Sequence, residues 1–149
     1  MDATDRKLIG ALRSTARATN SDLARTTGLA RGTVQTRLAR LSDTGTIRGW
    51  GPELDPAGTD HPVTSFTFVS IAQGALDDVL AGLQAIPEVL EVHVTTGRSD
   101  VLCRIACRTN DHLHDVIQNL VAIKGVARTD SQLVLSSPIL RNHADLYTS

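Results

Sequence analysis

Small and hydrogen-bonding side chains recur along one face of a predicted helix that runs from about Arg31 to Asp43. Its inward stripe is formed by Val34, Leu38 and Leu41, which recur at helical spacing. The outward and flanking positions are occupied by Gly32, Thr33, Gln35, Thr36 and Arg40. Hydroxyl, amide and guanidinium groups bind base edges and phosphates. This face therefore has the chemistry needed to contact a nucleic acid.

The residues before this helix have the spacing of a helix-turn-helix. Ala24 is small enough for a close helix crossing, Gly28 can adopt the positive φ of a tight turn, and Val34 supplies a buried contact on the next helix. Thr19 and Asp22 approximate a capping pair for the middle helix. Apolar residues recurring from Asp5 to Ala16 predict a supporting first helix, with Asp5 suited to the positive helix N-terminus.

Charge divides the chain, although the formal net charge is only −1. Residues 1–50 contain nine Lys or Arg against four acidic residues, whereas the remainder contains six against twelve. A basic segment joined to an acidic one is typical of a nucleic-acid-binding domain attached to a domain with another task. A merely solvated basic face is the alternative, and the helix-turn-helix spacing argues against it.

Gly and Pro residues between the two segments predict a linker. We place the helix-turn-helix domain at residues 1–50, the linker at 51–62 and a second domain at 63–149. No apolar run approaches the roughly 20 residues that cross a bilayer, and the N-terminus does not resemble a signal peptide, so we expect a cytoplasmic protein without membrane contact.

The second domain alternates strand and helix patterns. Strands are predicted over 63–71, 90–96, 101–108 and 127–136, with helices over about 76–86 and 113–123. The segments IPEV at 86–89 and IKGV at 123–126 repeat at a spacing of 37 residues. We therefore predict an α+β chain: an N-terminal helix-turn-helix domain, winged-helix-like, followed by a ferredoxin-like βαββαβ domain. Helices cover one face of such a sheet, so we expect a second copy of the chain to cover the other.

Over nearly its full length the chain resembles the Lrp/AsnC family of transcription regulators. The resemblance lies in DRKLIGAL at 5–12, the helix-turn-helix LARTTGLARGTVQTRLARL, GTIRGW at 45–50, LDP at 54–56 and the Gly97-x-x-Asp100 turn. It implies a DNA-binding domain, a domain that binds amino acids or related metabolites, and dimers assembled into octamers or similar discs. One departure is Ala30, where the family often has Ser or Thr to begin the recognition helix, so we expect this helix to rely on another cap and to lose roughly 1 kcal/mol.

Double-stranded DNA is thus the expected partner. We expect base-edge contacts from Thr33, Gln35, Thr36 and Arg40 around Gly32, and phosphate contacts from Arg25, Arg31, Arg37 and Arg48. For Arg37 an alternative is an ion pair with an acidic residue of its own domain, since it lies beside the apolar stripe.

A small effector, an amino acid, is the second expected partner. Gly97 could bring backbone amides close to a carboxylate, and Asp100 could receive an ammonium group at an interface between dimers. Residues that could line the same region are Thr95, Thr96, Thr129, Asp130 and Ser131. The alternative is an ordinary hairpin in which Asp100 bonds its own loop.

Cys103 and Cys107 lie on one face of a predicted strand, roughly 13 Å apart, which is too far for a disulfide. We interpret them as core residues, with a redox sensor as the alternative.

Neither a metal site nor a cofactor is expected, because the histidines lack zinc-ligand spacing. Nor are there catalytic motifs, so we expect no enzyme. A ferredoxin-like dimeric enzyme and an architectural DNA-binding protein that needs no effector remain the alternatives.

Overall fold

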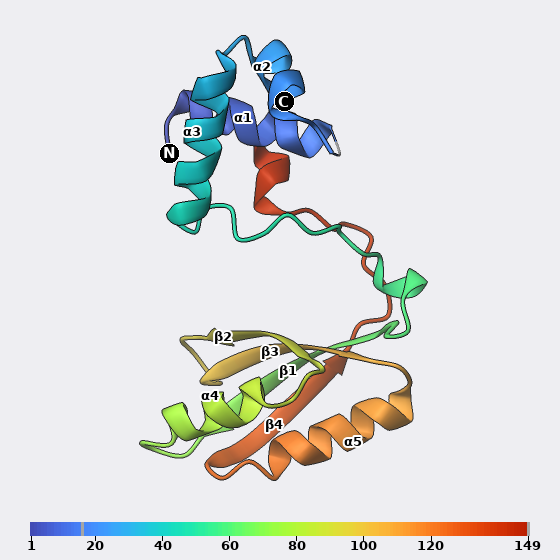
Figure 1. Ribbon diagram of the computed structural model, residues 1–149. Coiled ribbons are helices and arrows are strands. Elements are labelled where there is room, and N and C mark those ends of the chain that lie inside the picture. Colours follow the sequence, from blue (N-terminus) through green and yellow to red (C-terminus); the bar gives the residue numbers. More distant parts are fainter. Residues whose placement is uncertain (16, 149) are drawn as a thin grey trace. The chain divides into compact units, whose positions relative to one another are not determined.

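The computed structural model describes residues 1–15 and 17–148, and these form two compact units. The head unit consists of Met1–Pro52 together with Pro138–Ser149, and the sheet unit consists of Glu53–Ser137 (Figure 1). Within the described residues, none of the helices is long and apolar enough to pass through a lipid bilayer.

Three helices build the head unit: α1 (Ala3–Ser14), α2 (Asn20–Thr27) and α3 (Arg31–Asp43). The side chains of Leu8, Leu23 and Val34 are buried between them, which confirms the predicted inward stripe of α3. Thr19 and Asp22 form a complete capping box at α2, and Gly28 ends that helix with a left-handed φ of 73°. The helix-turn-helix is therefore built as its spacing predicts.

The first helix begins earlier than predicted. Asp2 is its N-cap and Asp5 is the third helical residue, because each carboxylate accepts a hydrogen bond from the other's backbone amide at 2.9 Å. This reciprocal pair fixes the first turn at Ala3 rather than Asp5. The helix ends at Ser14, and Ala16, the last apolar residue of the predicted helix, lies outside the described residues.

The C-terminal residues correct the expectation that 63–149 forms one domain. We call residues 138–148 the C-terminal strap; its short 3-10 helix η2 (His143–Tyr147) packs on α1 of the head unit. Arg13 Nε donates to Asp145 Oδ1 at 2.6 Å. Gly10 has no side chain to obstruct the Tyr147 carbonyl, with which a Cβ would collide. The strap belongs to the head unit because its contacts are made there.

The sheet unit has the element order predicted for a ferredoxin-like fold. After a 3-10 turn η1 (Pro56–Gly58) come β1 (Val63–Ile71), α4 (Leu76–Gln84), β2 (Val89–Val94), β3 (Val101–Cys107), α5 (Asn110–Val121) and β4 (Val126–Leu133). The sheet order is β2-β3-β1-β4, with antiparallel neighbours throughout. Both helices lie on one face of the sheet (Figure 1).

The internal repeat appears as two identical turns. The amides of Ile86 and Val89 donate to the carbonyls three residues earlier, and Ile123 and Val126 do the same 37 residues later. Val89 and Val126 then begin β2 and β4. The repeated segments thus perform the same local function, turning a helix into a strand.

The helix-covered face of the sheet supplies the core. Val69, Cys103 and Ile105 are buried there against Leu83 and Leu120. The side chains that alternate with them point to the opposite face, where Phe66 pairs with Arg104 across the strands and Phe68 pairs with Leu102. We call this second surface the uncovered face, because α4 and α5 do not lie on it.

Candidate nucleic-acid interface

The outer face of α3 contains the residues predicted to contact DNA. They line an open hollow of about 440 Å³, which we call the groove-side hollow: Gly32, Thr33, Thr36, Arg37 and Arg40. Gly32, Thr33 and Thr36 are all exposed. The structure therefore brings three of the predicted base-contacting residues together with Gly32 and Arg37 on one surface.

Two arginines of this surface are bound by a carboxylate that was not predicted to contact them. Asp5 is fully buried, and its two carboxylate oxygens each lie 2.7 Å from Nη2 of Arg40. Nη1 of Arg37 lies 2.8 Å from Asp5 Oδ1 and 2.7 Å from Asp2 Oδ2. The intramolecular alternative for Arg37 is therefore what the structure shows, while the pairing of Arg40 with Asp5 was missed.

A sequence signal for this pairing existed. Asp5 stands three and seven residues before Leu8 and Leu12, so it continues the apolar stripe of α1 toward the core. An acidic side chain on such a stripe is buried, and a buried carboxylate requires a cationic or hydrogen-bonding partner. Reading Asp5 only as a helix-terminus acid overlooked this requirement.

Both carboxyl groups are held in their ionised form. Hydrogen bonds from the Asp2 amide, and then from Arg37 and Arg40, lower the pKa of Asp5 to about 2 against the opposing effect of burial. The Arg37 guanidinium and the Asp5 amide lower the pKa of Asp2. At neutral pH the cluster thus contains two negative and two positive charges.

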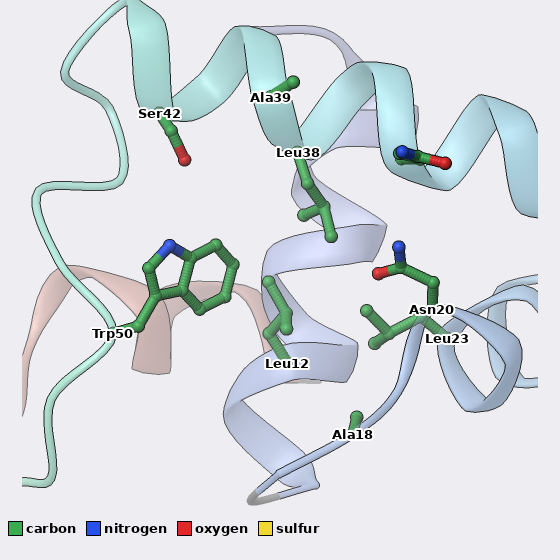
Figure 2. Close-up of a pocket in the computed structure, with 9 residues that line it drawn as sticks. Leu12, Ala18, Asn20, Leu23, Leu38, Ala39, Ser42 and Trp50 are labelled. Carbon is green, nitrogen blue, oxygen red and sulfur yellow. The ribbon is translucent and has the colours of Figure 1, made fainter.

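Gln35 lies on the other flank of α3. It lines a hollow of about 260 Å³ with residues of α1 and α2 and with Trp50. Figure 2 shows the Trp50 indole beside Leu12, with Leu38 and Ser42 extending from α3 above them. The predicted base-contacting residues therefore occupy two sides of α3, Gln35 being separate from the groove-side hollow.

The remaining predicted phosphate ligands are surface residues. Arg31 and Arg48 are exposed. Arg25 pairs with Asp22 at 3.0 Å, yet 81% of its side chain remains accessible. Such an exposed pair is weak and can exchange for a phosphate. Lys7, by contrast, donates to the Thr27 carbonyl at 2.7 Å and so satisfies the end of α2.

The predicted effector residues separate into a hairpin and two faces of β4. Thr95, Thr96 and Gly97 lie in the turn between β2 and β3, where Thr95 Oγ1 donates to the Ser99 carbonyl at 2.9 Å. Asp100 Oδ2 accepts the backbone amide of Ile71 at 2.7 Å, beside the irregularity in β1. The Asp100 side chain therefore bonds the backbone of β1, rather than its own loop as the hairpin interpretation expects.

Residues 129–131 of β4 cannot form one cluster, because strand side chains alternate between faces. Thr129 and Ser131 share a face with the buried Val69 and Thr67, and the Ser131 hydroxyl lies 2.9 Å from that of Thr67. Asp130 points to the uncovered face. There it helps to line a hollow of about 160 Å³, the sheet-end hollow, formed by Phe68, Ser70, Arg98, Ser99, Arg128 and Asp130.

The cysteines are core residues. Cys103 and Cys107 are fully buried on the helix-covered face. Burial raises the pKa of Cys103 to about 11 and also raises the pKa of Cys107. Since the reactive species is the thiolate, these environments favour a packing role over redox sensing.

Both units match known domain families. Residues 1–42 match the AsnC-type helix-turn-helix domain, and residues 64–143 match the Lrp/AsnC ligand binding domain. The first match lies within the head unit, and the second covers most of the sheet unit and extends into the strap.

Relatives align along almost the whole chain. Regulatory protein AsnC of Escherichia coli is 31% identical over 144 residues, covering 95% of this chain and 94% of its own. The transcriptional regulator AldR of Mycolicibacterium smegmatis is 33% identical over 138 residues, covering 90% of this chain and 81% of its own.

Solved structures share the fold. The structure of E. coli AsnC superimposes with a TM-score of 0.84 at 28% identity, covering 97% of this chain and 98% of its own. A Neisseria meningitidis transcriptional regulator in complex with L-Met gives the same TM-score and identity, covering 97% of this chain and 95% of its own. These proteins are transcription regulators and not enzymes, so the enzyme alternative is set aside. The chain belongs to the Lrp/AsnC family of transcription regulators.

Proposed function

We propose that this regulator recognises a specific DNA sequence by placing α3 in the major groove. The observation that carries the proposal is the exposed surface formed by Gly32, Thr33 and Thr36, which faces away from the core contacts of α3. Small residues allow a helix to approach the groove floor, and hydroxyl groups can bond base edges.

The arginines divide by their surroundings. Arg40 is placed at the groove-side hollow and is proposed to contact a base edge, while Gln35 would contact bases from the opposite flank of α3. Arg25, Arg31 and Arg48 are proposed to bind phosphates, because their exposed side chains can follow the DNA backbone. Arg37 is bound by two aspartates and is proposed to hold the domain together instead.

Fluorescence anisotropy across a salt series tests this arrangement. The probes are the DNA upstream of the protein's own gene and a scrambled duplex of equal length. Arg31→Ala should weaken binding to both and reduce the salt slope by about one, whereas Thr36→Val should mainly reduce the preference for the upstream DNA. Arg108→Ala, an exposed arginine of the sheet unit, is the matched control and should change neither.

Equal and weak binding of the wild-type protein to both duplexes would contradict recognition of this site. Selection from random-sequence DNA would then decide whether another operator exists. If no sequence were enriched, specific recognition would be wrong.

We further propose that the effector is an amino acid bound at the sheet-end hollow. Arg98 and Arg128 provide cationic groups for a carboxylate, and Asp130 provides an anionic group for an ammonium. Phe68 supplies an apolar wall, and the volume of about 160 Å³ suits a small molecule. The Neisseria relative solved with L-Met supports an amino acid as the ligand class. Asp130 replaces Asp100 in this proposal, because Asp100 already binds the Ile71 amide.

Calorimetric titration with the twenty amino acids, singly and pooled, tests the effector. Binding should be lost in Asp130→Asn and Arg128→Gln but retained in Lys124→Gln, which changes an exposed cation in the turn before β4. If the wild-type protein bound none of them while still recognising DNA, the proposed amino-acid effector would be wrong.

We also propose a homodimer formed through the uncovered face, with dimers able to assemble into octamers or similar rings. A single layer of helices leaves Phe66, Phe68 and Leu102 on that face. Because its target is DNA, we place the protein in the cytoplasm.

A further inference from the structure

We propose that Asp5 is a specificity-determining positioning residue: it fixes the Arg40 guanidinium at the groove-side hollow and, with Asp2, withholds Arg37 from the DNA backbone. This inference rests on the proposed base readout by α3. Asp2, the N-cap of α1, and Asp5, in its first turn, are not themselves expected to touch DNA.

The geometry at Arg40 indicates that Asp5 orients the guanidinium toward DNA and does not withhold it from DNA. The contact described for Arg40 with Asp5 uses Nη2, which lies 2.7 Å from both carboxylate oxygens. A guanidinium has five N–H donors, so the Nε and Nη1 edge is geometrically separate from this contact. The Arg40 side chain is 54% exposed, whereas Asp5 is completely buried. A base acceptor can therefore approach Arg40 from the solvent side while Asp5 binds it from behind.

Asp5 is itself rigidly placed. Its Oδ2 accepts the Asp2 amide at 2.9 Å within the capping box, and its backbone belongs to the first turn of α1. A carboxylate fixed in this way restricts the rotamers of the arginine bound to it. Restricting Arg40 before binding reduces the conformational entropy lost when it contacts a base.

Arg37 is treated differently by the same two acids. Its Nη1 contacts both Asp2 and Asp5, and only 27% of its side chain is exposed. Each phosphate neutralised by a protein cation steepens the salt dependence by about 0.9 and strengthens binding to any sequence. Holding Arg37 on two carboxylates therefore removes one contribution to non-specific affinity from the face that meets DNA.

The second capping box of the head unit has a different arrangement. Asp22 is the corresponding acid of α2, but it is 41% exposed and pairs with Arg25, which is 81% exposed. That arginine can leave its partner for a phosphate at little cost. Burial of the acid, rather than the capping box alone, thus distinguishes the cluster of Asp2 and Asp5.

Two charge-removing variants test the inference. Asn is as good an N-cap as Asp, so Asp2→Asn should preserve α1 while weakening the hold on Arg37. We expect tighter binding to scrambled DNA and a salt slope steeper by up to about one. Asp5→Asn should also lower the ratio of operator affinity to scrambled-DNA affinity by about tenfold. A bidentate contact to a base discriminates against the wrong base by roughly 5- to 150-fold.

A double-mutant cycle separates positioning from a merely structural role. If Asp5 acts through Arg40, Asp5→Asn should cause no further loss of base preference in an Arg40→Ala background. Leu23→Val is the stability control, since it reduces a buried contact of α2 away from the arginines and should leave both preference and salt slope unchanged. Circular dichroism at the assay temperature identifies the folded fraction of each variant.

The outcomes are distinguishable. Suppose that the wild-type protein recognises its operator, and that Asp2→Asn and folded Asp5→Asn keep the same base preference and salt slope. This result overturns the inference about Asp5 and leaves the proposed base readout standing. If Asp5→Asn does not fold, Asp2→Asn decides the question. The inference is overturned if this variant has the salt slope and the affinity for scrambled DNA of the wild-type protein. A wild-type protein without sequence preference overturns the proposed base readout and this inference with it.

Discussion

Asp5 shows how one buried residue connects stability with recognition. An isolated buried carboxylate is strongly destabilising, and it is tolerated only when hydrogen bonds and opposite charges surround it. Here a backbone amide and two guanidinium groups perform that function. The head unit consequently depends on the ionised form of Asp5.

We expect this dependence to appear in acid. The pKa of folded Asp5, about 2, lies below its ordinary value of 3.8, so its stabilising contribution is present above pH 4 and is lost as the pH falls from about 4 to 2. The shift corresponds to roughly 2 kcal/mol. Urea unfolding followed by circular dichroism at pH 7, 4, 3 and 2 measures it.

Asp5→Asn is the reference for this titration, because Asp2, Asp22 and Asp145 also have lowered pKa values and contribute in both proteins. The difference in unfolding free energy between wild type and variant should shrink through the acid range. A difference that stayed constant from pH 7 to pH 2 would contradict the assigned ionisation of Asp5.

At the residue scale, helical spacing predicted which residues share the outer face of α3 but not how its arginines are held. Helical spacing determines which side of α3 Thr36 and Arg40 occupy. The partner of Arg40 lies 35 residues away on another helix, and its identity depends on how α1 crosses α3. Spacing along one helix contains no information about that crossing.

Among the three α-helices that the structure describes in the head unit, α3 is the one that begins without a side-chain cap. Its N-cap is Ala30, whose extended φ and ψ of −66° and 142° suit a cap but whose side chain cannot accept a hydrogen bond. The other two head helices begin with complete capping boxes. The sequence led us to expect another cap in place of Ala30, but no side chain of the described residues caps the start of α3 in the structure.

Ala30→Ser should stabilise the protein by about 1 kcal/mol, because the hydroxyl can accept a hydrogen bond from an unpaired amide of the first turn. Thermal unfolding by circular dichroism measures the change. Ala39→Ser introduces the same side chain within α3 and should be neutral or destabilising, since serine has the lower helix propensity. Equal effects of the two substitutions would show that capping is not the cause.

The contact between α1 and the strap makes a second prediction about elements. Gly10→Ala places a methyl group against the Tyr147 carbonyl and should destabilise the head unit by about 1–3 kcal/mol or displace the strap. Gly32→Ala is the control, because a Cβ there meets nothing within 4 Å and the exchange should be neutral or stabilising.

Nuclear magnetic resonance can follow the strap directly, since Tyr147 is the single tyrosine of the chain. Its ring signals should shift toward random-coil positions in Gly10→Ala and remain unchanged in Gly32→Ala. Unaltered Tyr147 signals together with unaltered stability in Gly10→Ala would contradict the close approach.

Sequence patterns predicted the α-helices and strands of the two units, whereas the 3-10 helices, the element ends and the strap's contacts required the folded structure. The last strand was expected to reach residue 136 but ends at Leu133, where its pairing with Ser65 of β1 ends. The strap has no regular apolar pattern, and its ion pair joins residues 132 positions apart. Contacts of that separation are decided by tertiary packing.

For the whole molecule, the uncovered face leads to a prediction about assembly. Phe66→Glu places a charge in the proposed interface and should convert dimers to monomers at micromolar concentration in multi-angle light scattering. Leu76→Glu is the control, since Leu76 has nearly the same exposure, 37% against 38% for Phe66, but lies in the first turn of α4. A wild-type monomer, or a dimer unaffected by Phe66→Glu, would contradict dimerisation through this face.

The strap has a consequence for how the protein is made. The head unit contains both early and late residues, so the sheet unit is an insertion within it. A ribosome adds about 5–20 residues per second, and Asp145 therefore follows Arg13 by on the order of ten seconds. All four strands have been synthesised before η2 exists. The contact between η2 and α1 is therefore among the last that the head unit can form, after every residue of the sheet has been added.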